Sequence, residues 1–204
     1  MNRTTRRLSV AGPAGAIECA VDDTSAPSRG TAVLCHPHPQ FGGTMDNKVV
    51  QTMARALVQV GYRAVRFNFR GVGSSQGAWN EGLGEVDDAL AVINDSIAAT
   101  EGEWVLGGFS FGGYVAAAAA SRLGPTRTVR RLVLVGPAVQ NFPVPAVPAD
   151  TLVVHGEHDE VVPLAAVLDW ARPQSLPVTV VPGGGHFFHG QLPLLKQIIT
   201  GAWH

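Results

Sequence analysis

The clearest chemical signal is Ser110, at the centre of the pentapeptide GFSFG, which has the form G-x-S-x-G. An apolar run precedes the serine, and a helix-forming run rich in alanine follows it. A serine on a sharp turn from a strand into a helix is an exposed nucleophile, and the turn requires small residues on both sides because larger side chains would collide across it. The alternative is a serine that only caps the helix. The flanking patterns favour the nucleophile.

A serine nucleophile needs a base to take its proton and an acid to orient that base, and after such a turn they follow in the order acid, then histidine. The later chain offers Asp159, within HGEHDEVVP, and His186, directly after three glycines. Both segments follow apolar strand candidates, and active sites of open α/β sheets gather at the carboxyl ends of strands. We expect His186 to be the base and Asp159 the acid. Glu157 and Glu160 remain alternatives for the acid, and His189 for the base.

A third segment, CHPHPQFGG, follows the first apolar strand candidate of this alternating region. The oxyanion of acyl transfer is stabilised by two N–H groups, one from the residue after the nucleophile, here Phe111, and one from this first loop. Pro37 and Pro39 carry no N–H, so His38 and Gln40 are the candidate donors in the tight part of the loop. We expect His38 to be the second donor, on a loop that the prolines stiffen.

The two histidines of this segment also allow a metal site, in which His36 and His38 would join His155, His158 or Asp159. Prolines follow both histidines of the loop, and no H-x-x-x-H helix spacing is present. Both observations argue against metal. We therefore expect neither a metal nor a cofactor.

A glycine-rich segment, FRGVGSS, follows another strand candidate. It lacks the G-K-[ST] ending of a phosphate-binding loop and the G-x-G-x-x-G spacing of a dinucleotide-binding loop. We expect a structural turn near the site, in which Arg70 ties loops together.

The elements that must position these residues alternate along the chain. Strands are predicted at 31–35, 63–69, 104–109, 131–135, 151–155 and 178–181, and two antiparallel strands in the first 25 residues. Helices are predicted at 47–60, 86–97, 112–123 (closed by Gly124-Pro125), from 163 to before 173, and at 189–203. This alternation predicts the α/β class: a three-layer α/β/α sandwich with a mainly parallel sheet.

Residues 136–150 form the only long coil that the pattern predicts, with four prolines. Proline removes a backbone donor and interrupts helices, so a helical cap is not expected here. We expect residues 1–204 to form a single domain without a lid.

Composition and charge exclude other classes. The 204 residues fit one domain, and 46% hydrophobic content excludes a disordered chain. A net charge of −1 provides no electrostatic attraction for nucleic acid, so the sequence does not indicate a nucleic-acid-binding protein. The basic start lacks the apolar region of a signal peptide, and no apolar run is long enough to span a membrane. We expect a cytoplasmic protein with Cys19 and Cys35 as buried free thiols. Whether two copies form a homodimer stays open.

In this order, H-P-H-P-x-x-G-G, R-G-x-G-x-S, G-F-S-F-G, H-G-x-x-D-x-x-V-P and G-x-x-H-F resemble the α/β-hydrolase superfamily over roughly residues 30–190. Within it, the chain is similar to compact, lidless bacterial serine hydrolases related to the dienelactone hydrolases. The resemblance implies carboxylesterase-like activity on a small-molecule acyl substrate, bound beside Phe41, Gly42 and Gly43.

Two points stay open within this resemblance. Dienelactone hydrolases use a cysteine nucleophile, and Ser110 therefore argues against a dienelactone substrate. Ester, thioester, lactone and short amide bonds all suit the same machinery. A thioesterase, a peptidase and a non-catalytic module that binds a ligand or a partner are the alternatives to an esterase.

Overall fold

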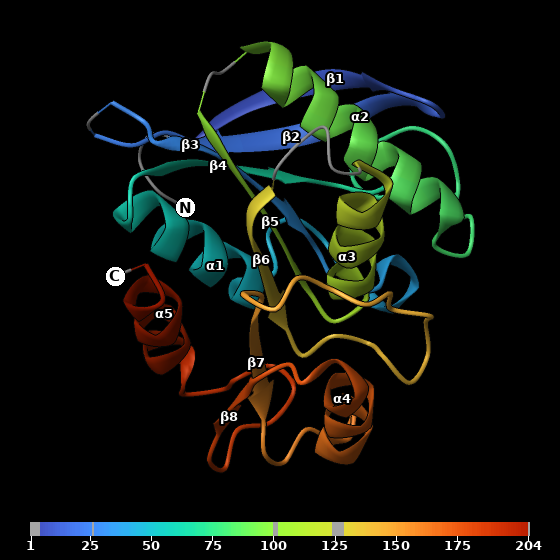
Figure 1. Ribbon diagram of the computed structural model, residues 1–204. Helices are drawn as coiled ribbons and strands as arrows, with labels where there is room; N and C mark the ends of the chain where they lie inside the picture. Colours follow the sequence, from blue (N-terminus) through green and yellow to red (C-terminus); the bar gives the residue numbers. More distant parts are fainter. Residues whose placement is uncertain (1–4, 26, 100–101, 124–128, 204) are drawn as a thin grey trace.

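A computed structural model describes residues 5–25, 27–99, 102–123 and 129–203, apart from the side chains of 97–99. Its centre is an eight-stranded sheet with the strand order β1-β2-β4-β3-β5-β6-β7-β8 (Figure 1). The strands are β1 (Arg6–Gly12), β2 (Gly15–Asp22), β3 (Gly30–Cys35), β4 (Tyr62–Phe67), β5 (Glu103–Phe109), β6 (Val129–Val135), β7 (Leu152–Gly156) and β8 (Val178–Val181). The helices are α1 (Lys48–Gln59), α2 (Leu83–Ala99), α3 (Phe111–Leu123), α4 (Leu164–Ala171) and α5 (Leu192–Gly201).

The strand directions confirm the predicted sheet. The six strands β4, β3, β5, β6, β7 and β8 run parallel to one another. Helical crossovers through α1, α2, α3 and α4 make four of the five connections between them, and the coil of residues 136–150 makes the connection from β6 to β7. β1 and β2 form the expected antiparallel pair, and β2 joins the sheet antiparallel to β4. The carboxyl ends of β3, β5, β7 and β8 consequently face the same edge, which is where the candidate chemistry follows each strand.

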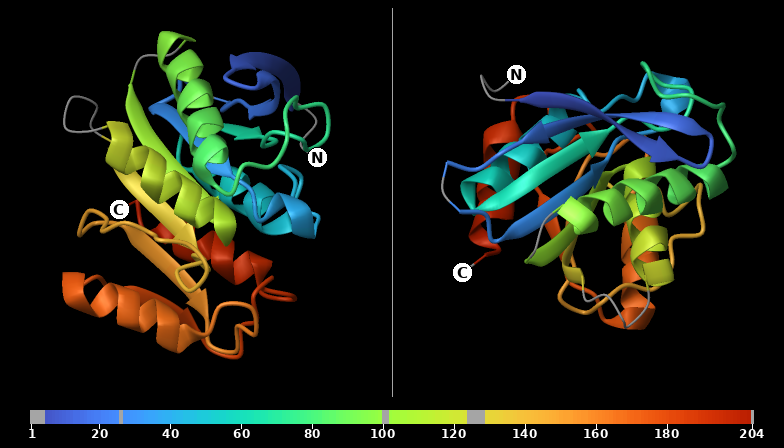
Figure 2. Two further views of the ribbon diagram at one scale, coloured as in Figure 1. Left: turned by 90° about the vertical axis from the view of Figure 1, so that its right-hand side faces the viewer. Right: turned by 90° about the horizontal axis from the view of Figure 1, so that it is seen from above.

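Helices cover both faces of the sheet and make three layers (Figure 2). One face packs against α1 and α5, through residues such as Met53, Leu57 and Leu195. The other packs against α2, α3 and α4, through residues such as Ile93, Val115 and Val167. This confirms the three-layer α/β/α class. None of the described helices is long and apolar enough to cross a membrane.

Two of the predicted boundaries that were wrong have a reason visible in the backbone. The last helix begins at Leu192 rather than at residue 189, because Phe188 and Gly190 have positive φ angles of 51° and 75° and form turns. The strand predicted to reach Phe69 ends at Phe67, since the Phe69 N–H donates to the ring of His36 instead of to the sheet. The predicted helix end at Gly124-Pro125 lies outside the described residues.

The long coil, residues 136–150, contains no helix and lies along α3 and α4. The indole of Trp170 donates to the Val144 carbonyl at 3.1 Å, and the Val147 N–H donates to Gln174 at 3.0 Å. These bonds hold the coil against the body of the protein, so it forms no lid domain. Cys19 and Cys35 are buried and free, as predicted, and burial raises the pKa of both thiols.

Candidate active site

Ser110 lies on the sharp turn that the sequence predicted, between the end of β5 and the start of α3. Its φ angle is +57°, a left-handed conformation that is strained for a non-glycine residue. A Cβ atom on Gly108 would lie 2.0 Å from the carbonyl oxygen of Gly112, and one on Gly112 would lie 2.3 Å from that of Cys35. Both glycines are therefore needed for the turn itself. This is the geometry of a nucleophile elbow, not of a simple helix cap.

His186 and Asp159 come from the loops after β8 and β7, and the structure joins them directly. The Nδ1 of His186 donates to one carboxylate oxygen of Asp159 at 2.7 Å. The other oxygen accepts the N–H groups of Val161 at 2.9 Å and Val162 at 2.7 Å. Both side chains are buried. The carboxylate can thus orient the imidazole because the backbone fixes the carboxylate.

The charge state of Asp159 follows from these contacts. Burial by itself raises the pKa of a carboxyl group, because it penalises the ionised form. The hydrogen bonds from His186 and from the Val162 N–H, together with the nearby charges of His186 and His155, outweigh burial and hold the pKa of Asp159 below its usual value. Asp159 is therefore ionised at neutral pH.

The alternative acids and the alternative base lie elsewhere. Glu157 is exposed and accepts the N–H of Gly183 at 2.8 Å, which ties two loops together. Glu160 is also exposed. His189 is exposed beside Phe187, with ring centres 5.9 Å apart. Of the candidate pairs, the hydrogen bond joins Asp159 to His186.

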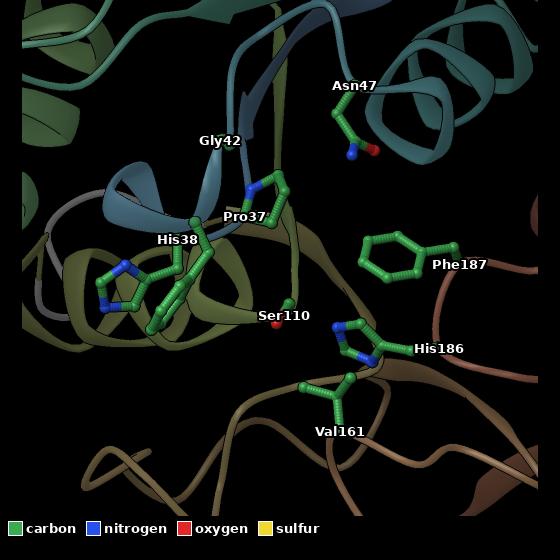
Figure 3. Close-up of a pocket in the computed structure, with 10 residues that line it drawn as sticks. Pro37, His38, Gly42, Asn47, Ser110, Val161, His186 and Phe187 are labelled. Atoms are coloured by element: carbon green, nitrogen blue, oxygen red, sulfur yellow. The ribbon is translucent and has the colours of Figure 1, made fainter.

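Ser110 and His186 line the same surface cavity, of about 430 Å³. Figure 3 shows the serine beside the imidazole, with one ring nitrogen on the side of the serine. The three residues expected to contact substrate, Phe41, Gly42 and Gly43, line this cavity too. Ser110 and His186 thus face one cavity, and Asp159 holds His186 from the protein interior.

The backbone N–H groups of the loop after β3 differ in whether they already have a hydrogen-bond partner. The Gln40 N–H donates to the ring of its neighbour His38 at 3.2 Å, so it is already occupied. Among the hydrogen bonds of the described residues, none uses the N–H of His38 or of Phe111. A Cβ atom at Gly43 would lie 2.0 Å from the Pro37 oxygen, which shows how tightly the loop turns. His38 rather than Gln40 is the loop residue with an available donor.

His36 is a structural residue. Its Nδ1 donates to the Pro37 carbonyl at 2.6 Å and its Nε2 accepts the Phe69 N–H at 3.1 Å, so both nitrogens are occupied and the ring is neutral. Burial lowers its pKa to about 4, partly offset by the bond to Pro37. In the described residues no three His, Cys, Asp or Glu side chains are grouped to hold a metal ion.

Arg70 has the expected structural role, but it ties its loop to α2 rather than to another loop. Its guanidinium forms a bidentate ion pair with Asp88, at 2.9 and 2.7 Å, and its backbone N–H donates to the same carboxylate at 3.1 Å. The pair is buried. Because these bonds use the guanidinium within the protein, the glycine-rich loop is structural.

Several residues of the site were not identified from the sequence. Val161 lies two residues after Asp159 and Phe187 directly follows His186, so their closeness in sequence to the candidate acid and base could have identified them. Asn47 and Phe142 had no such signal, because folding alone brings them beside Ser110. His155 was noticed only as a metal ligand; its Nε2 lies 3.6 Å from Asp159 and bonds to the Val162 carbonyl at 2.9 Å.

Comparison with known proteins agrees with this geometry. A family model described as alpha/beta hydrolase fold matches residues 33–150. An α/β serine hydrolase without a lid, from Xanthomonas campestris, is 37% identical, with a TM-score of 0.90 over 99% of this chain and 94% of that one. An α-β serine hydrolase homologue from Coxiella burnetii is 38% identical, with a TM-score of 0.89 over 96% of each chain.

A curated relative gives the same result at the level of sequence. An uncharacterized protein from Rickettsia prowazekii is 31% identical over 194 residues, which cover 87% of this chain and 79% of the relative. The resemblance to lidless serine hydrolases is confirmed, and the link to dienelactone hydrolases stays a prediction. With its fold, its serine turn and these matches, the chain belongs to the α/β-hydrolase family.

Proposed function

We propose that this protein is a serine hydrolase that cleaves small ester-like acyl substrates through an acyl-enzyme, as carboxylesterases do. The observation that carries the proposal is that Ser110, on a strained turn, lines one open cavity with His186, whose ring is hydrogen-bonded to Asp159. Strain of this kind persists where the surrounding structure holds it, and it is concentrated at functional sites.

In the proposed mechanism, the Oγ of Ser110 attacks the carbonyl carbon of the substrate while the Nε2 of His186 takes the hydroxyl proton. The hydrogen bond from Nδ1 to Asp159 keeps the proton of the neutral ring on Nδ1, so that Nε2 is the basic nitrogen. Once protonated, His186 returns the proton to the leaving oxygen. A water molecule, activated by the same imidazole, then hydrolyses the acyl-enzyme.

The N–H groups of Phe111 and His38 would receive the negative charge that develops on the substrate oxygen. Phe111 is the first residue of α3, where the helix dipole also favours negative charge. Both residues line the space beside Ser110. Donors that are fixed before the reaction cost no reorganisation in the transition state, which is the usual source of oxyanion stabilisation.

The test is covalent labelling of the folded protein with a fluorophosphonate probe, followed by turnover of matched ester, thioester, lactone and amide substrates. We expect one label on Ser110, located by mass spectrometry, and the fastest turnover with esters. Ser110→Ala should abolish labelling and turnover while the circular dichroism spectrum stays native.

Ser74→Ala is the matched control, because Ser74 is exposed on the glycine-rich loop. It should label like the wild type. Undiminished labelling of folded Ser110→Ala would overturn the mechanism. A protein that never labels would support a binding module instead, and preferred turnover of thioesters or amides would reassign the substrate class.

A further inference from the structure

Two cavities adjoin Ser110. The first has a volume of about 430 Å³, and we call it the Asn47 cavity. His186, Phe187 and Asn47 line this cavity and not the second. The second has a volume of about 360 Å³, and we call it the Phe142 cavity. The residues that line it and not the first are Phe111, Ala138, Asn141, Phe142 and Val162. Ser110, His38, Phe41 and Val161 line both. A substrate bonded to the serine therefore has two directions in which to extend.

The chemistry of the proposed reaction assigns one part of the substrate to each cavity. The leaving oxygen must accept a proton from His186, so the leaving group has to lie on the side of the imidazole. His186 lines the Asn47 cavity and not the Phe142 cavity. The alcohol part of an ester then occupies the Asn47 cavity, and the acyl part occupies the Phe142 cavity.

The side-chain amide of Asn47 uses its oxygen in hydrogen bonds to α1, whereas its nitrogen is available to a ligand. Its Oδ1 caps α1 by accepting the N–H groups of Val49 at 2.9 Å and Val50 at 3.5 Å. Since both partners are donors, the oxygen must face the helix and the Nδ2 group must face away from it. Figure 3 shows the nitrogen turned toward the space between Pro37 and Phe187. Across the described residues, no hydrogen bond from this Nδ2 is found.

The walls around this amide are mostly apolar. Pro37, Phe41, Val161 and Phe187 line the cavity, with the two glycines of the loop after β3. Apart from Ser110 and His186, the polar side chains of the lining are those of Asn47 and His38. The Nδ1 of His38 accepts the Gln40 N–H, so the ring proton is on Nε2, but Figure 3 shows both ring nitrogens on the side that faces away from Ser110. The ring lies against Phe41 and Trp79, at ring-centre distances of 4.7 and 4.5 Å.

We propose that Asn47 is a specificity-determining residue, whose Nδ2 donates a hydrogen bond to a second oxygen on the leaving alcohol. This inference rests on the proposed function. The preferred substrates are then esters of alcohols that carry an ether or hydroxyl oxygen, rather than esters of plain alkyl alcohols of the same size. An apolar pocket with one fixed donor discriminates through that donor, because an alkyl group would leave it without a partner.

The experiment compares pairs of butyrate esters with leaving groups of equal length: 2-methoxyethyl against n-butyl, and 3-methoxypropyl against n-pentyl. The readout is the ratio of kcat/KM for the ether ester to that for the alkyl ester. Asn47→Asp and Asn47→Ser both keep a good helix cap and remove the Nδ2 donor. One neutral hydrogen bond predicts that the ratio falls roughly three- to tenfold in both variants, for at least one pair.

Asn141→Asp is the matched control. It places the same new charge in the Phe142 cavity, and whatever it does to the individual rates, the ratio should stay at the wild-type value. Circular dichroism and fluorophosphonate labelling of each variant report that the fold and Ser110 are intact.

The outcomes separate the two proposals. Turnover with a ratio that neither Asn47 variant changes would overturn the role of Asn47 and leave the proposed function standing. An equal shift in Asn141→Asp would also overturn it, since charge alone would explain the result. No turnover of any ester would overturn the proposed function, and the inference with it.

Discussion

His186 is held by a carboxylate that the backbone itself holds. One oxygen of Asp159 lies 2.7 Å from the Nδ1 of His186, and the other accepts two consecutive backbone N–H groups, those of Val161 and Val162. The side chain therefore has little freedom to rotate. The orientation of the imidazole follows from the turn after β7, although His186 itself comes from the loop after β8.

Asp159→Asn tests this relationship. An amide group can present a donor to Nδ1 and so favour the ring tautomer with its proton on Nε2, where Ser110 needs a base. We expect kcat to fall by on the order of 10⁴, as replacement of the acid does in serine proteases. Glu157→Gln and Glu160→Gln, which keep every contact of Asp159, should change kcat little. Steady-state kinetics on a short ester measures all three, and a large loss in Glu157→Gln alone would mean that the acid is misassigned.

His155 packs behind the same carboxylate. It is fully buried, and its Nε2 donates to the Val162 carbonyl at 2.9 Å and lies 3.6 Å from Asp159. His155→Phe leaves that carbonyl without a donor, so the free energy of unfolding should fall by about 1–3 kcal/mol. Because the turn that holds Asp159 would loosen, kcat should fall more than KM changes.

His155→Gln is the conservative comparison, since its amide can still donate to Val162. It should recover most of the stability and of kcat. Urea denaturation and kinetics of the two variants measure this. Equal kcat in His155→Phe and the wild type would show that His155 only fills the core.

His36 makes stability depend on pH. Its pKa is lowered to about 4 in the folded protein, against an ordinary value near 6.5. Between these values the unfolded chain binds a proton that the folded protein does not. The contribution of His36 to the free energy of unfolding is therefore fully present above about pH 6.5. It is lost as the pH falls to about 4, and the total loss is about 3 kcal/mol. Burial lowers the pKa of His155 and His38 too, which adds in the same direction.

Urea denaturation at several pH values between 4 and 7.5 measures this loss. His36→Gln cannot titrate, so its free energy of unfolding should be lower at pH 7 but should change less with pH. A variant with the same pH slope as the wild type would show that other groups cause the acid sensitivity.

The parts of the site that sequence analysis identified are those encoded locally. Ser110 is recognisable because its glycines, strand and helix are contiguous. The sequence left three carboxylates as candidates for the acid, since only the fold shows which one reaches His186. Asn47 and Phe142 had no local pattern at all, because their role depends on how α1 and the long coil pack beside the elbow. The last helix begins later than predicted because Phe188 and Gly190 have left-handed backbone angles, and nothing in the residue type of Phe188 indicates such an angle.

The coil of residues 136–150 sets the size of the proposed acyl site. Phe142 packs against Phe111 and Tyr114, with ring centres 4.9 and 5.1 Å apart, and it walls the Phe142 cavity. Val144, within the coil, is buried. With the coil held down and without a helix, the described residues provide no apolar cover beyond the cavity for a long acyl chain. Each methylene left in water forgoes about 0.8 kcal/mol of binding.

We therefore expect kcat/KM to be highest for acyl chains of roughly two to six carbons, because longer chains gain no further burial. A series of p-nitrophenyl esters from acetate to palmitate, assayed below and above the concentration at which the substrate aggregates, measures this. Phe142→Ala should move the maximum toward longer chains by removing one wall, whereas Phe187→Ala, on the leaving-group side, should not. A maximum at palmitate, or a jump in rate when aggregates form, would mean that another segment covers the site as a lid does.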